Sequence, residues 1–359
     1  MQFAYMRPKM PDKDEFVKDD TTSLEDELSQ AEDDLWFLPS LPEEEPDFQL
    51  PGLRVEPQEA HIVEDWARAE ASCAALLARV SGRLGALDYR LLNGPQGWRQ
   101  RLALLEATEL SWFAGDRIGA DRLALWVALR LSGVQEDAAA LARIGWAVRR
   151  LTGGPGPDDG LMEFLGRHDL ETRTDQGVGV SDEAARWNEL LEMACDLHPI
   201  SKACMGYHLW TLVSLGQGRD QIEAAVTAGR IAASDGKGAI FAPLAMGGAG
   251  SLRADGPPSA RLRRWLDGME AAILTAMRQL DDIEAWAARA EKVMSPLSGR
   301  TPPALRAALA EWPMLSAPMG EKLTGASRPT VQRNLAWMES KGLIREVTGQ
   351  NRFKMWRAV

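Results

Sequence analysis

The chain has 359 residues, of which 45% are hydrophobic, and its formal net charge is −11. This length and composition predict two or three globular domains with a substantial apolar core. Three cysteines are too few for a disulfide-built secreted scaffold, no signal segment opens the chain, and no apolar run approaches the ~20 residues that span a bilayer, so we expect a cytoplasmic protein.

The acidic charge is concentrated at the N-terminus. Residues 1–65 contain 19 Asp or Glu against 5 Lys or Arg, whereas residues 66–298 contain 29 against 26. Runs of acid and proline with little apolar content predict an acidic, mostly disordered tail over residues 1–58. Within it, "LWFLPSL" brings Leu35, Trp36, Phe37 and Leu38 together. This cluster suits docking to a partner or to the protein's own body, or packing as a small satellite of the core.

Residues 59–298 follow a helical pattern almost throughout. In the first helix one face is apolar, formed by Ile62, Trp66, Ala69, Cys73, Leu76, Leu77 and Val80. The same periodicity predicts helices over 99–113, 119–133, 135–151, 181–197, 202–215, 219–234 and 259–293. β-branched alternation is nearly absent, so this region is predicted to be an all-α helical bundle with loops at its Gly and Pro clusters.

Four soft or borderline metal ligands lie close together in the sequence of this region. Their spacing is C-x2-H-x5-C-x3-H, formed by Cys195, His198, Cys204 and His208. Such a set can hold zinc tetrahedrally. Pro199 is expected to break one helix and begin another, so the four side chains need not converge, and buried packing of Cys and His is the favoured alternative. The sequence therefore predicts no metal and no cofactor.

Residues 299–359 follow a pattern of three helices and a β-hairpin. "PPALRAALAEW" predicts the first helix, Met319–Leu323 predicts the second, and Gly325 suits the left-handed turn before the third. The third helix has Ser327 as a good N-cap and one buried stripe formed by Val331, Leu335 and Met338. "LIREVT" and "FKMWRAV", joined around Gly349, predict the hairpin. This order resembles a winged helix-turn-helix domain.

The face of the third helix opposite that stripe is suited to DNA. Arg and Gln side chains pair with base edges in the major groove, and Thr contacts phosphate or a thymine methyl group. With the cap residue and two basic residues near the hairpin tip, the candidate DNA-binding set is Ser327, Arg328, Thr330, Gln332, Arg333, Arg352 and Lys354. Residues 299–359 also contain 10 Lys or Arg against 4 Asp or Glu. A basic module in an acidic chain favours a partner of double-stranded DNA and a role in transcription regulation.

A homodimer is expected because one small module rarely gathers enough contacts for a specific DNA site. The candidate interface is a stripe on the predicted 259–293 helix, formed by Trp265, Met269, Ile273, Met277, Leu280 and Ile283. The alternative is that this stripe belongs to the internal core. A winged helix can also serve as a protein docking module, in which case Arg328 and Arg333 would tolerate substitution.

Two family resemblances add to this interpretation. "GDRIGADRLALWVALRLSG" and "GWAVRRLTGGPGP", followed by the C-terminal module, resemble an uncharacterised bacterial family that pairs a helical domain with a helix-turn-helix DNA-binding domain. This resemblance covers nearly everything after the tail. It implies DNA binding and says nothing firm about an enzyme.

The second resemblance is to Fic-type enzymes, which transfer a nucleotide moiety to a hydroxyl group. His198 and Pro199 match the start of their motif, but Ile200 replaces the Phe and Lys202 replaces the metal-binding acid. The phosphate-binding glycines and the arginine of that motif are also missing. A Fic-like nucleotidyl-transferring enzyme, or a degenerate pseudoenzyme with an accessory winged helix, is therefore the alternative function, and the sequence favours a protein that is not an enzyme.

Overall fold

The computed structural model describes residues 58–129, 138–166, 177–213, 215, 221–253, 255–349 and 353–359. Contacts divide the chain into Met1–Glu56 and Pro57–Val359, and only the second unit contains described residues. The predicted acidic tail and its aromatic cluster thus lie outside the described residues, Gln58 excepted. The described chain is mostly helical, as the sequence predicts, and no helix in it is long and apolar enough to cross a membrane.

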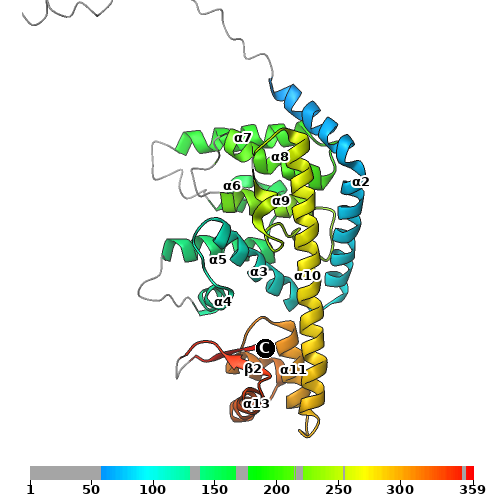
Figure 1. The fold of residues 1–359 in the computed structure, drawn as a ribbon. Coiled ribbons are helices and arrows are strands. Elements are labelled where there is room, and N and C mark those ends of the chain that lie inside the picture. Colours follow the sequence, from blue (N-terminus) through cyan, green and yellow to red (C-terminus); the bar gives the residue numbers. More distant parts are fainter. Residues whose placement is uncertain are drawn as a thin grey trace, which may run out of the picture. The chain divides into compact units, whose positions relative to one another are not determined.

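The elements follow one another from an N-terminal helical region to a C-terminal region that also contains strands (Figure 1). In chain order they are α2 (Gln58–Asn93), α3 (Gly97–Phe113), α4 (Ala120–Leu129), α5 (Ala138–Thr152), η1 (Pro157–Asp159), α6 (Leu161–Leu165), α7 (Gly177–Met193), α8 (Pro199–Leu212), α9 (Gln221–Ala232), η2 (Ala249–Leu252), α10 (Pro258–Met294), α11 (Thr301–Glu311), β1 (Leu315–Ser316), α12 (Ala317–Thr324), α13 (Arg328–Ser340), β2 (Ile344–Glu346) and β3 (Met355–Ala358).

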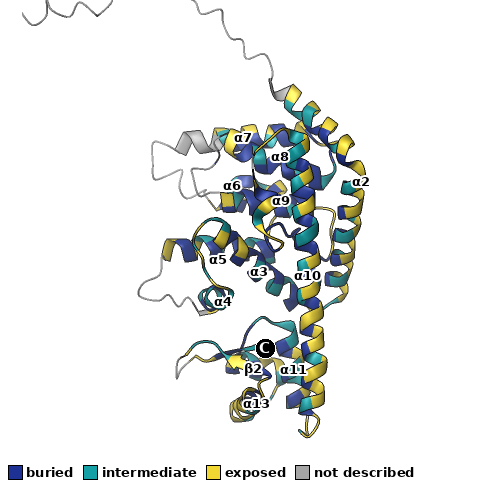
Figure 2. Cartoon of the chain, in the orientation of Figure 1, coloured by how far each residue is buried: buried dark blue, intermediate teal, exposed yellow. Residues whose placement is uncertain are grey.

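The two longest helices, α2 and α10, lie side by side (Figure 1). Ion pairs join them at successive levels: Arg79 Nε lies 2.7 Å from Glu270 Oε1, and Arg90 Nη1 lies 2.6 Å from Asp281 Oδ1. Both pairs join residues 191 positions apart, so the two helices run in the same direction. Each helix buries one face and exposes the other (Figure 2). The intervening helices therefore have to carry the chain back to the end where α2 begins.

The apolar stripe of α10 is internal core. Trp265, Met269 and Ile273 are at most 1% exposed within the single chain, and Leu280 is fully buried. Much of this surface packs against α2 and η2. The stripe is therefore unavailable as a dimer interface, and that part of the sequence interpretation was wrong. Periodicity identifies a face that must be buried without identifying what buries it.

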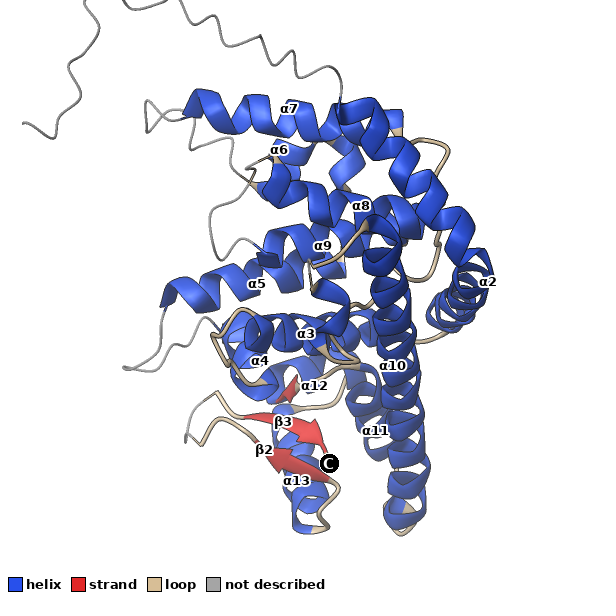
Figure 3. Cartoon of the chain, turned by 45° about the horizontal axis from the view of Figure 1, so that its top comes forward, coloured by secondary structure: helices blue, strands red, loops and turns tan. Residues whose placement is uncertain are grey.

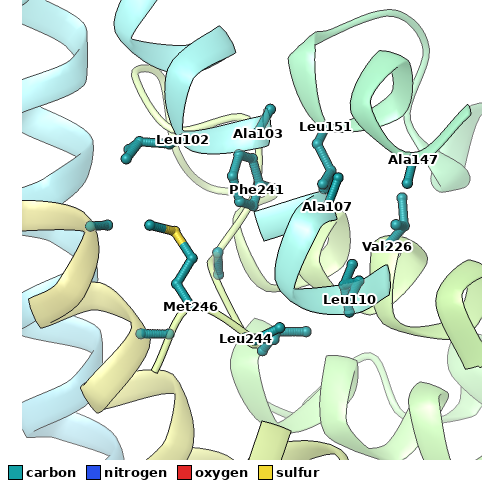
Figure 4. Close-up of a cluster of buried hydrophobic side chains, with 14 of the residues drawn as sticks. Leu102, Ala103, Ala107, Leu110, Ala147, Leu151, Val226, Phe241, Leu244 and Met246 are labelled. Atoms are coloured by element: carbon teal, nitrogen blue, oxygen red, sulfur yellow. The ribbon is translucent and has the colours of Figure 1, made fainter. Parts of the chain in front are cut away.

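One cluster of buried apolar side chains lies where α3 meets α5, α9 and the segment that follows α9 (Figure 4). Ten of its apolar side chains are labelled there: Leu102, Ala103, Ala107, Leu110, Ala147, Leu151, Val226, Phe241, Leu244 and Met246. One carboxylate lies among them. Glu106 is 2% exposed and accepts hydrogen bonds from the backbone N–H groups of Leu244, Ala245 and Met246 at 2.9, 2.8 and 3.1 Å. It holds this irregular segment against α3.

The C-terminal elements form three helices and a three-stranded antiparallel sheet (Figure 3). β3 is the central strand, and Trp356 pairs with Leu315 of β1 on one side and Glu346 of β2 on the other. The pairing of β2 with β3 was predicted from the sequence. β1 was not predicted, because a strand of two residues has no alternation to detect.

The C-terminal elements also contact the helical region directly. Trp286 of α10 donates its indole N–H to the carbonyl oxygen of Leu343 at 2.8 Å, and Trp98 of α3 donates to that of Ala310 at 3.3 Å. On another side, Arg345 of β2 lies 2.8 Å from Asp121 of α4. These contacts join α3, α4 and α10 to the last sixty residues, roughly the segment predicted as a separate domain.

Candidate nucleic-acid interface

The turn between α12 and α13 has the geometry that its sequence predicts. Gly325 adopts φ +67°, the left-handed conformation, and its N–H bonds to the carbonyl oxygen of Glu321 at 2.9 Å. Ser327 then has the extended backbone of an N-cap, but its side chain makes no capping bond. Its hydroxyl instead lies 3.0 Å from the hydroxyl of Thr330. The first N–H groups of α13 therefore have no side-chain cap.

α13 has one buried face and one polar, exposed face. Val331, Leu335 and Met338 are fully buried, which confirms the predicted stripe. On other sides of the helix, Arg328, Gln332 and Arg333 are exposed and Thr330 is half-buried. The helix ends where Gly342 adopts φ +66°. The candidate residues from Ser327 to Arg333 are thus gathered in the first two turns of one exposed helix.

An acidic residue lies beside one of these arginines. Arg328 Nε is 3.6 Å from Glu321 Oε1, and the Arg328 side chain is 60% exposed. An ion pair with this separation and exposure contributes little to the stability of the fold. The Arg328 side chain therefore remains largely accessible beside the turn.

The β2–β3 end contributes a second group of exposed residues. Lys354 is exposed, whereas Arg352 lies outside the described residues. Phe353 is 71% exposed and has φ +59°, an uncommon conformation for a bulky residue. Nothing in the sequence signalled this exposed ring. Because backbone strain clusters at functional sites and Phe353 precedes Lys354, we add Phe353 to the candidate interface.

The structure divides the basic residues of this segment into two groups. Arg306, Arg345 and Arg357 form ion pairs with Glu291 of α10 or Asp121 of α4. Five exposed basic residues form no ion pair with described residues: Arg300, Lys322, Arg333, Lys341 and Lys354. The positive charge counted from sequence is therefore partly neutralised by the helical region. Lys322, in the last turn of α12, is an additional candidate that the motif did not single out.

The four Cys and His residues proposed for zinc occupy different surroundings. Cys195 is exposed, whereas Cys204 is buried and burial raises the pKa of its thiol. His198 is the N-cap of α8, where its Nδ1 accepts a hydrogen bond from Ile200 N–H at 3.2 Å. His208 stacks on Trp66 with ring centroids 5.8 Å apart. Across the described residues, no three His, Cys, Asp or Glu side chains are grouped to hold a metal ion.

The same helix start bears on the Fic resemblance. Its His198 side chain serves as a helix cap, and its backbone N–H donates to Glu70 of α2 at 3.0 Å. Lys202, at the position of the metal-binding acid, lies one turn further into α8. His198 and Pro199 are thus explained as the N-cap and the first residue of α8.

Comparison with known proteins does not identify a family. No family model matches the chain, and a search of curated proteins found no match.

Proposed function

We propose that residues 299–359 form a winged helix-turn-helix domain, that α13 is its recognition helix, and that the protein is a sequence-specific DNA-binding regulator of transcription. The observation that carries the proposal is the exposed N-terminal part of α13, where Arg328, Gln332 and Arg333 lie beyond a left-handed turn. The resemblance to the uncharacterised helix-turn-helix family supports the same interpretation.

The chemistry of this surface matches the major groove. The groove admits one α-helix, and Arg and Gln each present two hydrogen-bonding groups that match the edges of guanine and adenine. The N–H groups at the start of α13 lack a side-chain cap and are suited to a phosphate oxygen. Ser327 and Thr330 supply hydroxyl groups at the same end.

The residues around α13 extend the proposed contact along the backbone of the duplex. Lys354 near the start of β3 and Lys322 at the end of α12 are exposed cations that can neutralise phosphates. Arg352 is proposed for the same role from its sequence position alone. Phosphate contacts of this kind fix the position of the module without reading the sequence.

A homodimer remains part of the proposal. Two copies of one small module double the contacts and match the two-fold symmetry of many regulatory sites. Its interface is a surface other than the α10 stripe, which lies in the core.

The test is a salt-titrated anisotropy assay with duplex fragments that include the DNA upstream of the protein's own coding sequence. Arg333→Ala should weaken binding to the preferred fragment by about 1–3 kcal/mol and reduce discrimination against a scrambled fragment. Lys354→Ala should weaken both fragments alike and lower the salt slope by about one. Arg278→Ala, at an exposed position of α10, is the matched control and should change neither.

Two results would count against the proposal. If the protein binds no fragment more tightly than scrambled DNA, sequence-specific regulation is rejected. If Arg328→Ala and Arg333→Ala both leave binding unchanged, α13 is not the recognition helix. Sedimentation of the same mixtures gives the stoichiometry, and a monomer with and without DNA would reject the homodimer.

A further inference from the structure

A cavity of about 1090 Å³ lies in the helical region, among α2, α8, α9 and the first turns of α10. Its apolar wall is aromatic, formed by Trp66 of α2, Phe113 at the end of α3, and Tyr207 and Trp210 of α8. Small-molecule pockets have volumes of about 300–1,000 Å³ and are lined mainly by apolar and aromatic groups. This cavity has the size and lining of such a site and shares no residue with the candidate nucleic-acid interface.

The aromatic wall is held in place by contacts within the protein. Trp66 stacks on His208 with an interplanar angle of 23°, and Tyr207 meets His208 edge-on at 77°. The Tyr207 hydroxyl donates to the carbonyl oxygen of Leu252 at 2.9 Å. These rings are therefore ordered before a ligand binds, which lowers the entropic cost of binding.

The charged residues around the cavity leave an excess of positive charge. Asp65 is paired with Arg68 at 2.5 Å, and Asp255 is paired with Arg264 at 2.7 Å. Arg261 lies on the first turn of α10 and in the cavity wall, and its guanidinium makes no ion pair or hydrogen bond with the described residues. Arg253, also in the wall, forms no ion pair with them either. Asp65 and Asp255 are thus paired with other arginines, and the Arg261 guanidinium is available to bind a ligand.

His208 does not alter this balance at neutral pH. Burial, and then the charges of Arg261 and Arg264, lower its pKa to about 4. The imidazole is neutral under those conditions and acts as part of the aromatic wall. Among the described residues that line the cavity, the positive charge therefore comes from arginine.

We propose that this cavity binds a small aromatic carboxylate, with its ring against Trp66 and Tyr207 and its carboxylate accepting hydrogen bonds from the Arg261 guanidinium. Planar rings pack favourably on aromatic side chains, and arginine matches the geometry of a carboxylate. An uncharged aromatic ligand would leave Arg261 unmatched, and an aliphatic carboxylate would make poorer contacts with the rings. The inference concerns the helical region and does not depend on DNA binding.

The probes are 1-naphthoate, its uncharged analogue 1-naphthamide, and hexanoate, each titrated into the full-length protein by calorimetry. We expect 1-naphthoate to bind with a Kd below about 1 mM and more tightly than either other probe. Arg261→Gln should weaken 1-naphthoate by about tenfold or more and leave the amide unchanged, because only the carboxylate uses the charge. Arg263→Gln, two residues along α10 and exposed, is the matched control and should change neither.

Variants of the wall test the ring contact separately. Trp66→Phe keeps an aromatic ring and should weaken 1-naphthoate and 1-naphthamide in parallel, with circular dichroism confirming that the helices remain. The proposal is overturned if 1-naphthoate fails to bind at about 1 mM. It is also overturned if the carboxylate and amide bind equally and Arg261→Gln affects neither.

Discussion

At the scale of single residues, Glu106 places a carboxylate inside the apolar core. Its carboxylate is 2% exposed and meets three successive backbone N–H groups, those of Leu244, Ala245 and Met246. Burial raises the pKa of Glu106 to about 7, and the three N–H groups oppose that rise. The carboxyl group therefore holds the segment after α9 in place, and its contribution to the free energy of unfolding depends on pH.

The residue-scale prediction is that Glu106 makes the free energy of unfolding depend on pH. Glu106→Gln should remove this dependence. Between about 4.5 and about 7 the folded protein keeps a proton on Glu106 that the unfolded chain releases. The free energy of unfolding should therefore fall as pH rises through this window, by up to about 1.4 kcal/mol per pH unit. Denaturant unfolding of wild type and Glu106→Gln across this range measures the difference between the two.

The comparison with the variant separates Glu106 from groups that act in the opposite direction. His208 has a lowered pKa, so its contribution is lost as pH falls below its ordinary value of 6.5 toward about 4. That contribution is common to both proteins and cancels in the difference. A difference that stays flat between about 4.5 and about 7 would mean that the three N–H donors keep Glu106 ionised in the folded protein.

At the scale of elements, the end of α11 depends on a side chain from α3. Arg101 donates to the carbonyl oxygens of Leu309, Ala310 and Trp312 at 3.1, 3.4 and 2.6 Å. The last carbonyls of a helix have no partner within it, and a cation there also interacts favourably with the helix dipole. Burial lowers the pKa of Arg101 to about 10, so the guanidinium is charged at neutral pH. One side chain thus caps α11 and ties it to α3.

The element-scale prediction is that Arg101→Met loosens α11 selectively. The free energy of unfolding should decrease by about 2–3 kcal/mol, because hydrogen bonds to a charged group are lost while the apolar stem is kept. Hydrogen exchange should show faster opening of Thr301–Glu311. Arg99→Met is the control, because Arg99 donates to Gly238 and Leu91 within the helical region. Equal exchange of α11 in both variants would contradict the capping role.

At the scale of the whole molecule, charge is distributed unevenly along the chain. Residues 1–65 contain 19 Asp or Glu against 5 Lys or Arg, and residues 299–359 contain 4 against 10. An acidic segment tethered to a basic module meets it at high effective concentration. If residues 299–359 bind DNA as proposed, the acidic segment would compete with phosphates for the exposed cations of that module, among them Lys322, Arg333 and Lys354.

The whole-molecule prediction is that deleting residues 1–58 tightens DNA binding at low salt. The gain should shrink as salt is added, since screening shortens the reach of the charges to about 10 Å at 0.1 M. The same anisotropy assay measures it. A variant with the acids of residues 1–58 changed to their amides, at unchanged length, is the control for charge. Unchanged affinity of the truncated protein at low salt would leave the segment a solubilising or partner-docking role.

The sequence by itself determined the helical class, the faces that are buried, and the local turns. Helical periodicity is a local property, so the burial of Trp66 and Val80 in α2 and of Val331 and Leu335 in α13 could be predicted. Gly325 and Gly342 could be placed because left-handed turns select glycine. The exposed face of α13 follows from its buried one, which is why Arg328, Gln332 and Arg333 were identified.

Only the tertiary structure decided which surfaces meet. It placed the α10 stripe against α2 and η2, paired Arg345 and Arg357 with Asp121, and brought Glu106 to three backbone N–H groups more than one hundred residues away. It also separated Cys195 from the buried Cys204 and formed the cavity beside Arg261. These are contacts between segments distant in sequence. Their partners depend on how the helices pack, which local periodicity does not encode.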